Sequence, residues 1–401
     1  MVREKNDIYR KIILFILFLT ATNIFQYGTY LIFLLFAAVV IVDRKMKIDQ
    51  TGLLLLLFAI TYVIFCGING ESYSNSLFRI VIFPLAYMIG LSLYKEATEE
   101  KIRNIILFIA VSMATRPVSN FVYNLVLEGE AAFKSGESVD IGTGVVSAAT
   151  GQAAYYFFLI GTLAYVFFAL KEKKLRFALF VLYIVSLIHD IALGGRTFIL
   201  LTVISLVVGL IYSLYSSKEK SPVYKAVLII ALLLFAVYVL FTFNVFGLRD
   251  FYESSYMYFR LYSIYSISFL ETSRIDRKLV YISNMFKYPF GGNNIRRNLG
   301  VGYAHELWLD VFDDAGWIPY LLLCIYTLVS IFRWLRLAKG LKDRSIGVLV
   351  VGLLAVLLTA FFLEPILAGC PTVFAMYCIV DGVISSHLNY KKRAAVTAGE
   401  S

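Results

Sequence analysis

The chain has 401 residues, of which 60% are hydrophobic and only 16% are charged. Because soluble domains carry about a quarter charged residues, this composition excludes a conventional soluble protein and predicts a chain embedded in a membrane. The formal net charge of +10 would suit a nucleic-acid partner only if the basic residues formed one patch. They are instead spread along the chain, so no nucleic-acid partner is predicted.

Runs of roughly 16 to 24 predominantly apolar residues are long enough to cross a ~30 Å hydrocarbon core as helices. The sequence contains about twelve such runs, which predicts an all-α polytopic membrane protein. The first run follows a basic segment and is not followed by a small-residue cleavage site, so we expect it to remain as an uncleaved helix. The predicted spans lie near 12–24, 27–42, 51–68, 76–94, 104–127, 150–170, 175–193, 196–215, 224–243, 316–332, 346–363 and 372–388.

Basic residues indicate the side of the membrane on which each connection lies. Lys134 is the only basic residue in the short connections of one side, whereas the opposing set holds 25 of the 37 Lys and Arg residues. By the positive-inside rule the basic set is cytoplasmic, and it includes both termini. The basic set consists of the N-terminus, 43–50, 94–103, 171–176, 216–225, 333–344 and the C-terminal residues 391–393.

One connection, residues 244–315, is much longer than the others, and it is predicted to lie on the external, periplasmic side. Its many tyrosines argue against disorder, so we expect a folded loop containing short helices. The predicted organisation is nine spans in 1–243, this loop, three spans in 316–390 and a cytoplasmic tail in 391–401. The long loop follows span nine and no internal repeat is visible, which disfavours a carrier built from two similar halves.

The sequence does not indicate a metal site, a disulfide framework or a cofactor. It contains four cysteines without a Cys-x-x-Cys spacing and only three histidines.

Three arginines, Arg79, Arg116 and Arg196, are predicted near the external ends of spans, where an ionisable group is costly and therefore a candidate for function. Three guanidinium groups at one depth favour an anion such as a lipid phosphate or pyrophosphate. Gly194 and Gly195, before Arg196, would let a ligand approach the backbone at a helix start. Structural ion pairs are the alternative explanation, for instance Asp190 with Arg196 or Glu364 with Arg116; His189 and Asp381 are further ionisable residues within spans.

The segment 303–319 predicts an amphipathic helix that ends at Gly316. His305 is expected toward its apolar side, and an interfacial helix with a solvated acidic face fits the same spacing. Upstream, the turn 287–297 presents Arg296 and Arg297, which suit sugar hydroxyls or phosphate as well as they suit a solvated turn. The acidic face holds Glu306, Asp310, Asp313 and Asp314.

These segments resemble the family of bacterial O-antigen and capsule repeat-unit polymerases and O-antigen ligases (Wzy-like). The residues that carry the resemblance are Gly-Gly-Arg-Thr at 194–197, the large external loop, Pro-Phe-Gly-Gly at 289–292, and Tyr-Ala-His-Glu-Leu-Trp-Leu-Asp at 303–310 followed by Gly316. In that family the last motif usually reads His-Asn, and here Glu306 replaces the Asn. The resemblance covers mainly residues 190–335.

The resemblance implies a metal-independent glycosyltransferase of the bacterial inner membrane that polymerises undecaprenyl-pyrophosphate-linked oligosaccharides at the external leaflet, with a chain-length regulator as a further partner. His305 would be the base, with Glu306 and Asp310 as alternatives. The pyrophosphate would be bound by Arg196, with Arg116, Arg79, Gly194, Gly195, Arg296 and Arg297 as further substrate-binding residues. The alternatives are a ligase that transfers finished glycan to an acceptor and, from another class, a flippase for the same lipid.

Overall fold

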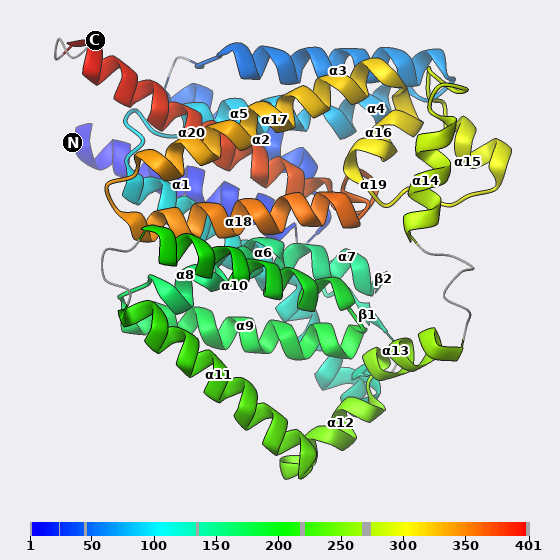
Figure 1. Ribbon diagram of the computed structural model, residues 1–401. Coiled ribbons are helices and arrows are strands. Elements are labelled where there is room, and N and C mark those ends of the chain that lie inside the picture. The colour runs from blue at the N-terminus through cyan, green and yellow to red at the C-terminus, as the bar shows by residue number, and fades with distance from the viewer. Residues whose placement is uncertain are drawn as a thin grey trace. The chain divides into compact units, whose positions relative to one another are not determined.

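The computed structural model describes residues 2–23, 25–43, 46–133, 136–216, 221–266 and 274–397. Within these ranges the chain is almost entirely helical, with one two-stranded antiparallel hairpin (Figure 1). Eight of the described helices are long and apolar enough to cross a membrane, or nine if two helices that meet at 100° count as one span. The prediction of an all-α, membrane-embedded chain is confirmed at this level, and the small hairpin was not foreseen.

The chain divides into two compact units. Unit 1 comprises residues 1–112, 272–337 and 361–401, and unit 2 comprises residues 113–271 and 338–360. The helices mainly in unit 1 are α1 (Val2–Thr22), α2 (Gly28–Asp43), α3 (Gln50–Ile68), α4 (Tyr73–Ile80), α5 (Ile82–Ser92), α14 (Arg274–Asn284), α15 (Asn294–Leu299), α16 (Leu307–Ala315), α17 (Trp317–Gly340), α19 (Ile366–Gly369) and α20 (Pro371–Thr397).

The elements of unit 2 are β1 (Glu137–Val139), β2 (Val146–Ala148), α7 (Ala149–Ala153), α8 (Phe157–Phe168), α9 (Lys173–Leu193), α10 (Arg196–Ser216), α11 (Ser221–Thr242), α12 (Leu248–Ser254) and α13 (Tyr256–Ser266). Helices α6 (Glu99–Glu128) and α18 (Arg344–Leu363) contribute residues to both units. Short 3₁₀ turns occupy Gly129–Phe133, Ala154–Tyr156 and Val245–Gly247.

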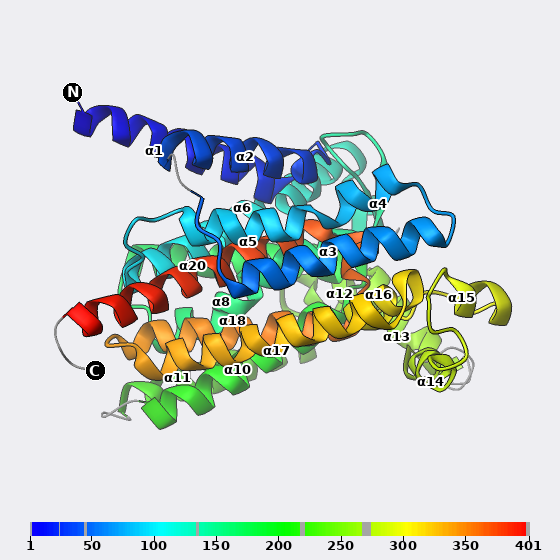
Figure 2. The same ribbon diagram turned by 90° about the horizontal axis from the view of Figure 1, so that it is seen from above.

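Small residues allow the central helices of unit 1 to pack closely. A Cβ atom added at Gly90 of α5 would lie 2.0 Å from the carbonyl oxygen of Ile379 in α20, and one added at Gly382 would lie 2.2 Å from that of Tyr87. The hydrophobic effect contributes little to the association of helices in lipid, so close backbone packing stabilises this helix pair instead. Within this unit both chain termini lie at one end of the helices, and α14, α15 and α16 lie at the other end (Figures 1 and 2).

One predicted span is interrupted, and the chain bends directly after another. The span expected at 76–94 is divided between α4 and α5, which meet at Val81. Pro84 explains the break, because proline has no N–H to donate to the carbonyl of Ile80 and its ring crowds that carbonyl. The span expected at 224–243 is α11, and the chain bends sharply after it into α12.

The helix expected to begin at residue 303 is shorter than predicted. Helix α16 begins at Leu307 after Glu306, and it ends at Ala315 with Gly316 as the predicted terminating residue. His305 has a φ of 56°, which is left-handed backbone and not helix. The prediction that His305 lies on the apolar side of this helix is therefore wrong, because the chain turns just before the helix starts.

Candidate functional site

The Pro-Phe-Gly-Gly turn caps the C-terminal end of α16. The backbone N–H of Gly292 donates to the carbonyl of Asp314 at 3.0 Å, and that of Asn293 donates to the carbonyl of Asp313 at 2.8 Å. These bonds satisfy carbonyl groups that a helix end leaves without partners. At Gly291 a Cβ atom would lie 2.6 Å from the backbone nitrogen of Ala315, so the first glycine of the pair is required for packing.

The same turn leads directly into α15, and this places Arg296 beside the acidic side of α16. Its Nε lies 2.6 Å from Oδ2 of Asp313, and its Nη2 lies 2.8 Å from Oδ1 of Asp314. Tyr62 donates to the other oxygen of Asp314 at 2.8 Å, and Arg79 of α4 approaches that oxygen at 3.8 Å. Arg296 and Arg79 therefore have carboxylate partners, so the alternative explanation of a structural ion pair applies to Arg79.

Glu306 pairs with a lysine that the sequence analysis did not single out. Lys278 of α14 lies 3.5 Å from the Glu306 carboxylate and 3.6 Å from the centroid of the Phe362 ring, and it donates to the Phe362 carbonyl. Both charged side chains are buried. Burial raises the pKa of Glu306, and Lys278 opposes that shift. An ion pair in this setting holds the start of α16 against α14.

Asp310 is the carboxyl group of this set without a cationic partner among the described residues. One oxygen accepts a hydrogen bond from the backbone N–H of Ala304 at 3.2 Å, and the other receives none from any described group. Asp310 is 4% exposed, and a cluster of buried apolar residues that includes Tyr281 and Phe312 lies between α14 and α16. Burial first, and then the charge of Asp314, raise the pKa of Asp310 to about 7.

Three of the four carboxyl groups of the predicted acidic face have a cationic side chain within 4 Å, and these cations lie on α4, α14 and α15. Burial without a cationic partner among the described residues favours the neutral form of the fourth carboxyl group, that of Asp310. The prediction of a solvated acidic face is wrong, since all four carboxyl groups are buried.

The other two candidates of this segment lie nearer the surface. His305 is partly buried, and Arg297 is exposed on α15. The ring of Tyr303 is 46% exposed and lies 4.2 Å from the guanidinium carbon of Arg296. An exposed aromatic ring, a histidine and an arginine thus follow each other along the edge of the buried acidic cluster.

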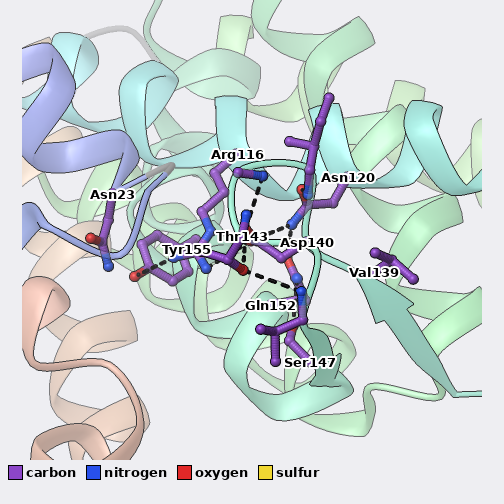
Figure 3. A network of polar contacts seen from close by, with 12 residues as sticks. Asn23, Arg116, Asn120, Val139, Asp140, Thr143, Ser147, Gln152 and Tyr155 are labelled. Atoms are coloured by element: carbon purple, nitrogen blue, oxygen red, sulfur yellow. Dashed lines mark hydrogen bonds and ion pairs between the residues drawn. The ribbon is translucent and has the colours of Figure 1, made fainter.

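In unit 2, Arg116 is buried in a polar network on α6 (Figure 3). Its guanidinium group forms an ion pair with Asp140 at 2.7 Å and donates to the Tyr155 hydroxyl at 3.1 Å. Asn120 also donates to Asp140, at 3.1 Å. Burial tends to raise the pKa of Asp140, but Arg116 and these hydrogen bonds outweigh it and lower that pKa. The partner of Arg116 is Asp140, and not Glu364 as the alternative explanation supposed.

This network attaches the β1–β2 hairpin to α6. Asn124 accepts from the backbone N–H of Val139 and donates to its carbonyl, both at 2.8 Å. Asp140 closes the turn of the hairpin by accepting from the backbone N–H groups of Gly142 and Thr143, at 3.1 Å each. The Asp-Ile-Gly-Thr-Gly sequence at 140–144 is a turn signal that a closer reading of the sequence would have found.

Side chains of the same unit fill the space beside the Gly-Gly turn between α9 and α10. Gly194 ends α9 with a φ of 73°, and its carbonyl accepts a hydrogen bond from Arg260 of α13 at 2.9 Å. A Cβ atom at Gly194 would lie 2.9 Å from Tyr256, and one at Gly195 would lie 2.0 Å from the carboxylate of Asp190. The expectation that these glycines leave space for a ligand is therefore corrected: side chains of the same unit fill it. Arg196 follows as the exposed first residue of α10.

The remaining ionisable residues of the spans lie in local networks. Asp381 of α20 forms an ion pair with Arg333 of α17 at 2.8 Å and accepts from the indole of Trp334 at 3.0 Å. The Nδ1 of His189 lies 2.8 Å from the Tyr156 hydroxyl. These arrangements hold helices together within each unit.

Sequence reasoning missed Lys278, although a signal was present. Leu279 and Ile282 recur at helical spacing and are 57% and 53% exposed, so α14 turns an apolar face outward. The opposite face must then be the buried one, and it carries Lys278 and Tyr281.

Among the described residues, no three His, Cys, Asp or Glu side chains are arranged to hold a metal ion. Comparison with models of known protein families gave no match, and neither did comparison with curated protein sequences.

Proposed function

We propose that this protein is a membrane glycosyltransferase that polymerises undecaprenyl-pyrophosphate-linked oligosaccharide repeat units at the external leaflet of the bacterial inner membrane. The observation that carries the proposal is Asp310, a buried carboxyl group without a cationic partner whose pKa is raised to about 7. It lies in the sequence segment that resembles the repeat-unit polymerases. A catalytic base works best when its pKa is close to the working pH.

The proposed reaction requires one proton acceptor and one anion-binding group. A hydroxyl group of one lipid-linked repeat unit attacks the anomeric carbon of the growing chain, and its proton passes to the carboxylate of Asp310. The bond between the anomeric carbon and the pyrophosphate oxygen breaks, and the lipid pyrophosphate leaves with that electron pair. Arg196, which the resemblance implies as the pyrophosphate ligand, is exposed in unit 2 at a helix start where backbone N–H groups also favour an anion.

The contacts favour Asp310 over the other two candidate bases. Glu306 has an ion-pair partner in Lys278, which stabilises its charged form and makes it a weaker base. His305 lies outside the helix and close to the exposed Tyr303, where it suits contact with a sugar. We therefore assign proton transfer to Asp310 and substrate contact to His305.

The outward apolar face of α14 supports a position at the membrane surface, where a lipid-linked substrate would be available. A helix with exposed Leu279 and Ile282 on one face, followed by the exposed Phe286, is suited to lie in the bilayer interface. In the proposed topology, α1, α2, the α4–α5 pair and α11 cross the membrane in addition to the eight long apolar helices. This makes twelve spans, with both termini cytoplasmic and residues 244–315 external.

The test compares Asp310→Asn, Glu306→Gln and His305→Ala in cells that depend on this protein, with Glu253→Gln as an exposed control. We expect Asp310→Asn to abolish long polymer at a normal membrane level of protein, and Glu306→Gln to retain part of it. His305→Ala should shorten the polymer or reduce its amount. Normal glycan ladders from Asp310→Asn at normal protein level would overturn the assignment.

The products of the same strains distinguish the polymerase from the ligase. Loss of a polymerase leaves single repeat units on the final acceptor, whereas loss of a ligase leaves long glycan on undecaprenyl pyrophosphate. We expect single repeat units with Asp310→Asn. Long glycan that accumulates on the lipid carrier would assign the protein to the ligase reaction instead.

A further inference from the structure

Unit 1 contains a cavity at the end of its helices where the chain termini lie, away from α16. The cavity has a volume of about 250 Å³, several times the ~30 Å³ share of one water molecule. The middle of α1, the ends of α2 and α5 and the start of α6 line it. Its lining includes apolar residues, among them Ile13 and Val39, and the basic residues Arg10, Lys95 and Lys101.

The basic side chains converge on one tyrosine. The guanidinium carbon of Arg10 lies 5.3 Å from the centroid of the Tyr94 ring, and the Nζ atom of Lys101 lies 5.4 Å from it. Lys47 donates to the backbone carbonyl of Tyr94 at 3.2 Å. The ring attracts each cation, but it cannot neutralise their charge, so the cations repel each other.

Two nearby carboxylates have other cations as partners. Glu99 pairs with Lys391 at 3.0 Å, and Glu100 approaches Arg103 at 3.7 Å. Among the described residues that line the cavity, three are basic and none is acidic. The cavity therefore has an excess of positive charge that an anion would relieve.

We propose that this cavity binds the phosphate group of an acidic phospholipid headgroup. Lysine and arginine are the side chains that bind phosphate oxygens, and the apolar wall fits the first carbons of the attached chains. With the termini on the cytoplasmic side, the lipid belongs to the cytoplasmic leaflet, where acidic headgroups and basic residues attract each other. This site is separate from the proposed glycosyltransferase site, and either can exist without the other.

The test is binding of phosphatidylglycerol to the delipidated full-length protein in detergent, counted by native mass spectrometry. Phosphatidylcholine is the zwitterionic comparison, and inorganic phosphate is the competitor. The variants are Arg10→Gln and Lys101→Gln, with Lys339→Gln as a control that removes the same charge from an exposed position outside the cavity. We expect each cavity variant to bind phosphatidylglycerol about tenfold more weakly and the control to bind normally, because a hydrogen bond to a charged group is lost.

The outcomes separate the sources of phosphate. Binding that persists in excess inorganic phosphate identifies a lipid as the ligand, whereas displacement by inorganic phosphate identifies free phosphate as a competing source for the same group. Equal binding of phosphatidylglycerol by the wild type and both cavity variants, or equal binding of phosphatidylcholine, would overturn the proposal. Lys95→Gln, which changes another exposed side chain of the cavity, provides the same comparison if Arg10→Gln or Lys101→Gln fails to fold.

Discussion

The carboxyl group of Asp310 is buried, has no cationic partner among the described residues and receives a single backbone hydrogen bond, so its charged form is costly. The pKa near 7 makes both activity and stability depend on pH in the neutral range. The two dependences have opposite signs, because a base acts in its ionised form and the folded protein prefers the protonated form. Opposite pH dependences of activity and stability would identify Asp310 as the titrating group more clearly than a loss of activity alone.

We predict that polymer formation rises with pH through about 7, because the carboxylate of Asp310 must be ionised to accept a proton. The folded state binds this proton more tightly than the unfolded state does. Its stabilising contribution is thus complete below the ordinary pKa of aspartate and is lost as pH rises through about 7, at about 1.4 kcal/mol per pH unit.

Thermal unfolding of the purified protein between pH 5 and 8 measures the second effect. Asp310→Asn removes the titrating group, so the pH dependence of its melting temperature should be flatter than that of the wild type. Identical profiles for the two proteins would show that Asp310 does not titrate in this range.

Arg196 gives the second prediction at this scale. We expect Arg196→Ala to eliminate polymer and Arg196→Lys to leave only a small residual activity, because lysine keeps the charge but not the planar group that contacts two phosphate oxygens. If Arg196 serves only as a partner of Asp190, Arg196→Lys should be nearly normal and Asp190→Asn as harmful as Arg196→Ala. Glycan ladders and protein levels of the three variants distinguish these cases.

At the scale of elements, the turn at 289–293 determines where α16 ends and where its carboxylates point. We predict that Gly291→Ala lowers the stability of the protein by about 2 kcal/mol or more, since alanine is strained at a φ of 74° and its Cβ would lie 2.6 Å from the backbone of α16. Gly369→Ala is the matched control, because no atom lies within 4 Å of its added Cβ. Thermal unfolding compares the two, and equal melting temperatures would contradict the packing role.

The β1–β2 hairpin provides the fourth prediction, because its attachment rests on the buried pair of Arg116 and Asp140. Asp140→Asn leaves the guanidinium group buried without its ionised partner, which costs about 3–5 kcal/mol. A double variant, Arg116→Met with Asp140→Leu, removes both charges and should recover most of the protein level. If it also recovers polymer, the role of Arg116 is to attach the hairpin; a stable double variant without polymer would assign Arg116 to the substrate.

At the scale of the whole molecule, the prediction concerns topology. In a variant without the native cysteines, Ser254→Cys on exposed α12 should react with a membrane-impermeant thiol reagent in intact spheroplasts. Lys342→Cys, in a connection rich in basic residues, should react only after the membrane is permeabilised. The reverse pattern would move α16 and its carboxylates to the cytoplasmic side and remove the basis for the proposed external reaction.

Helix formation and membrane character were predictable because they depend on composition and on the length of apolar runs, which are properties of the sequence itself. Most expected spans have a helix in the described residues, and the helix in the acidic segment ends at Gly316 as predicted. The break at Val81 was in principle readable from Pro84, because proline acts locally.

The partners of the charged residues were decided only by the tertiary structure. Arg116 and Asp140 are 24 positions apart in the sequence, and Tyr62, which donates a hydrogen bond to Asp314, is 252 positions away from it. Local residue spacing therefore does not predict either contact. The state of Asp310 depends on the same long-range packing: three of the four carboxyl groups have cationic partners, and the fourth is buried without one among the described residues. A sequence places a carboxyl group on a helix, but its burial and its neighbours determine whether it carries a charge.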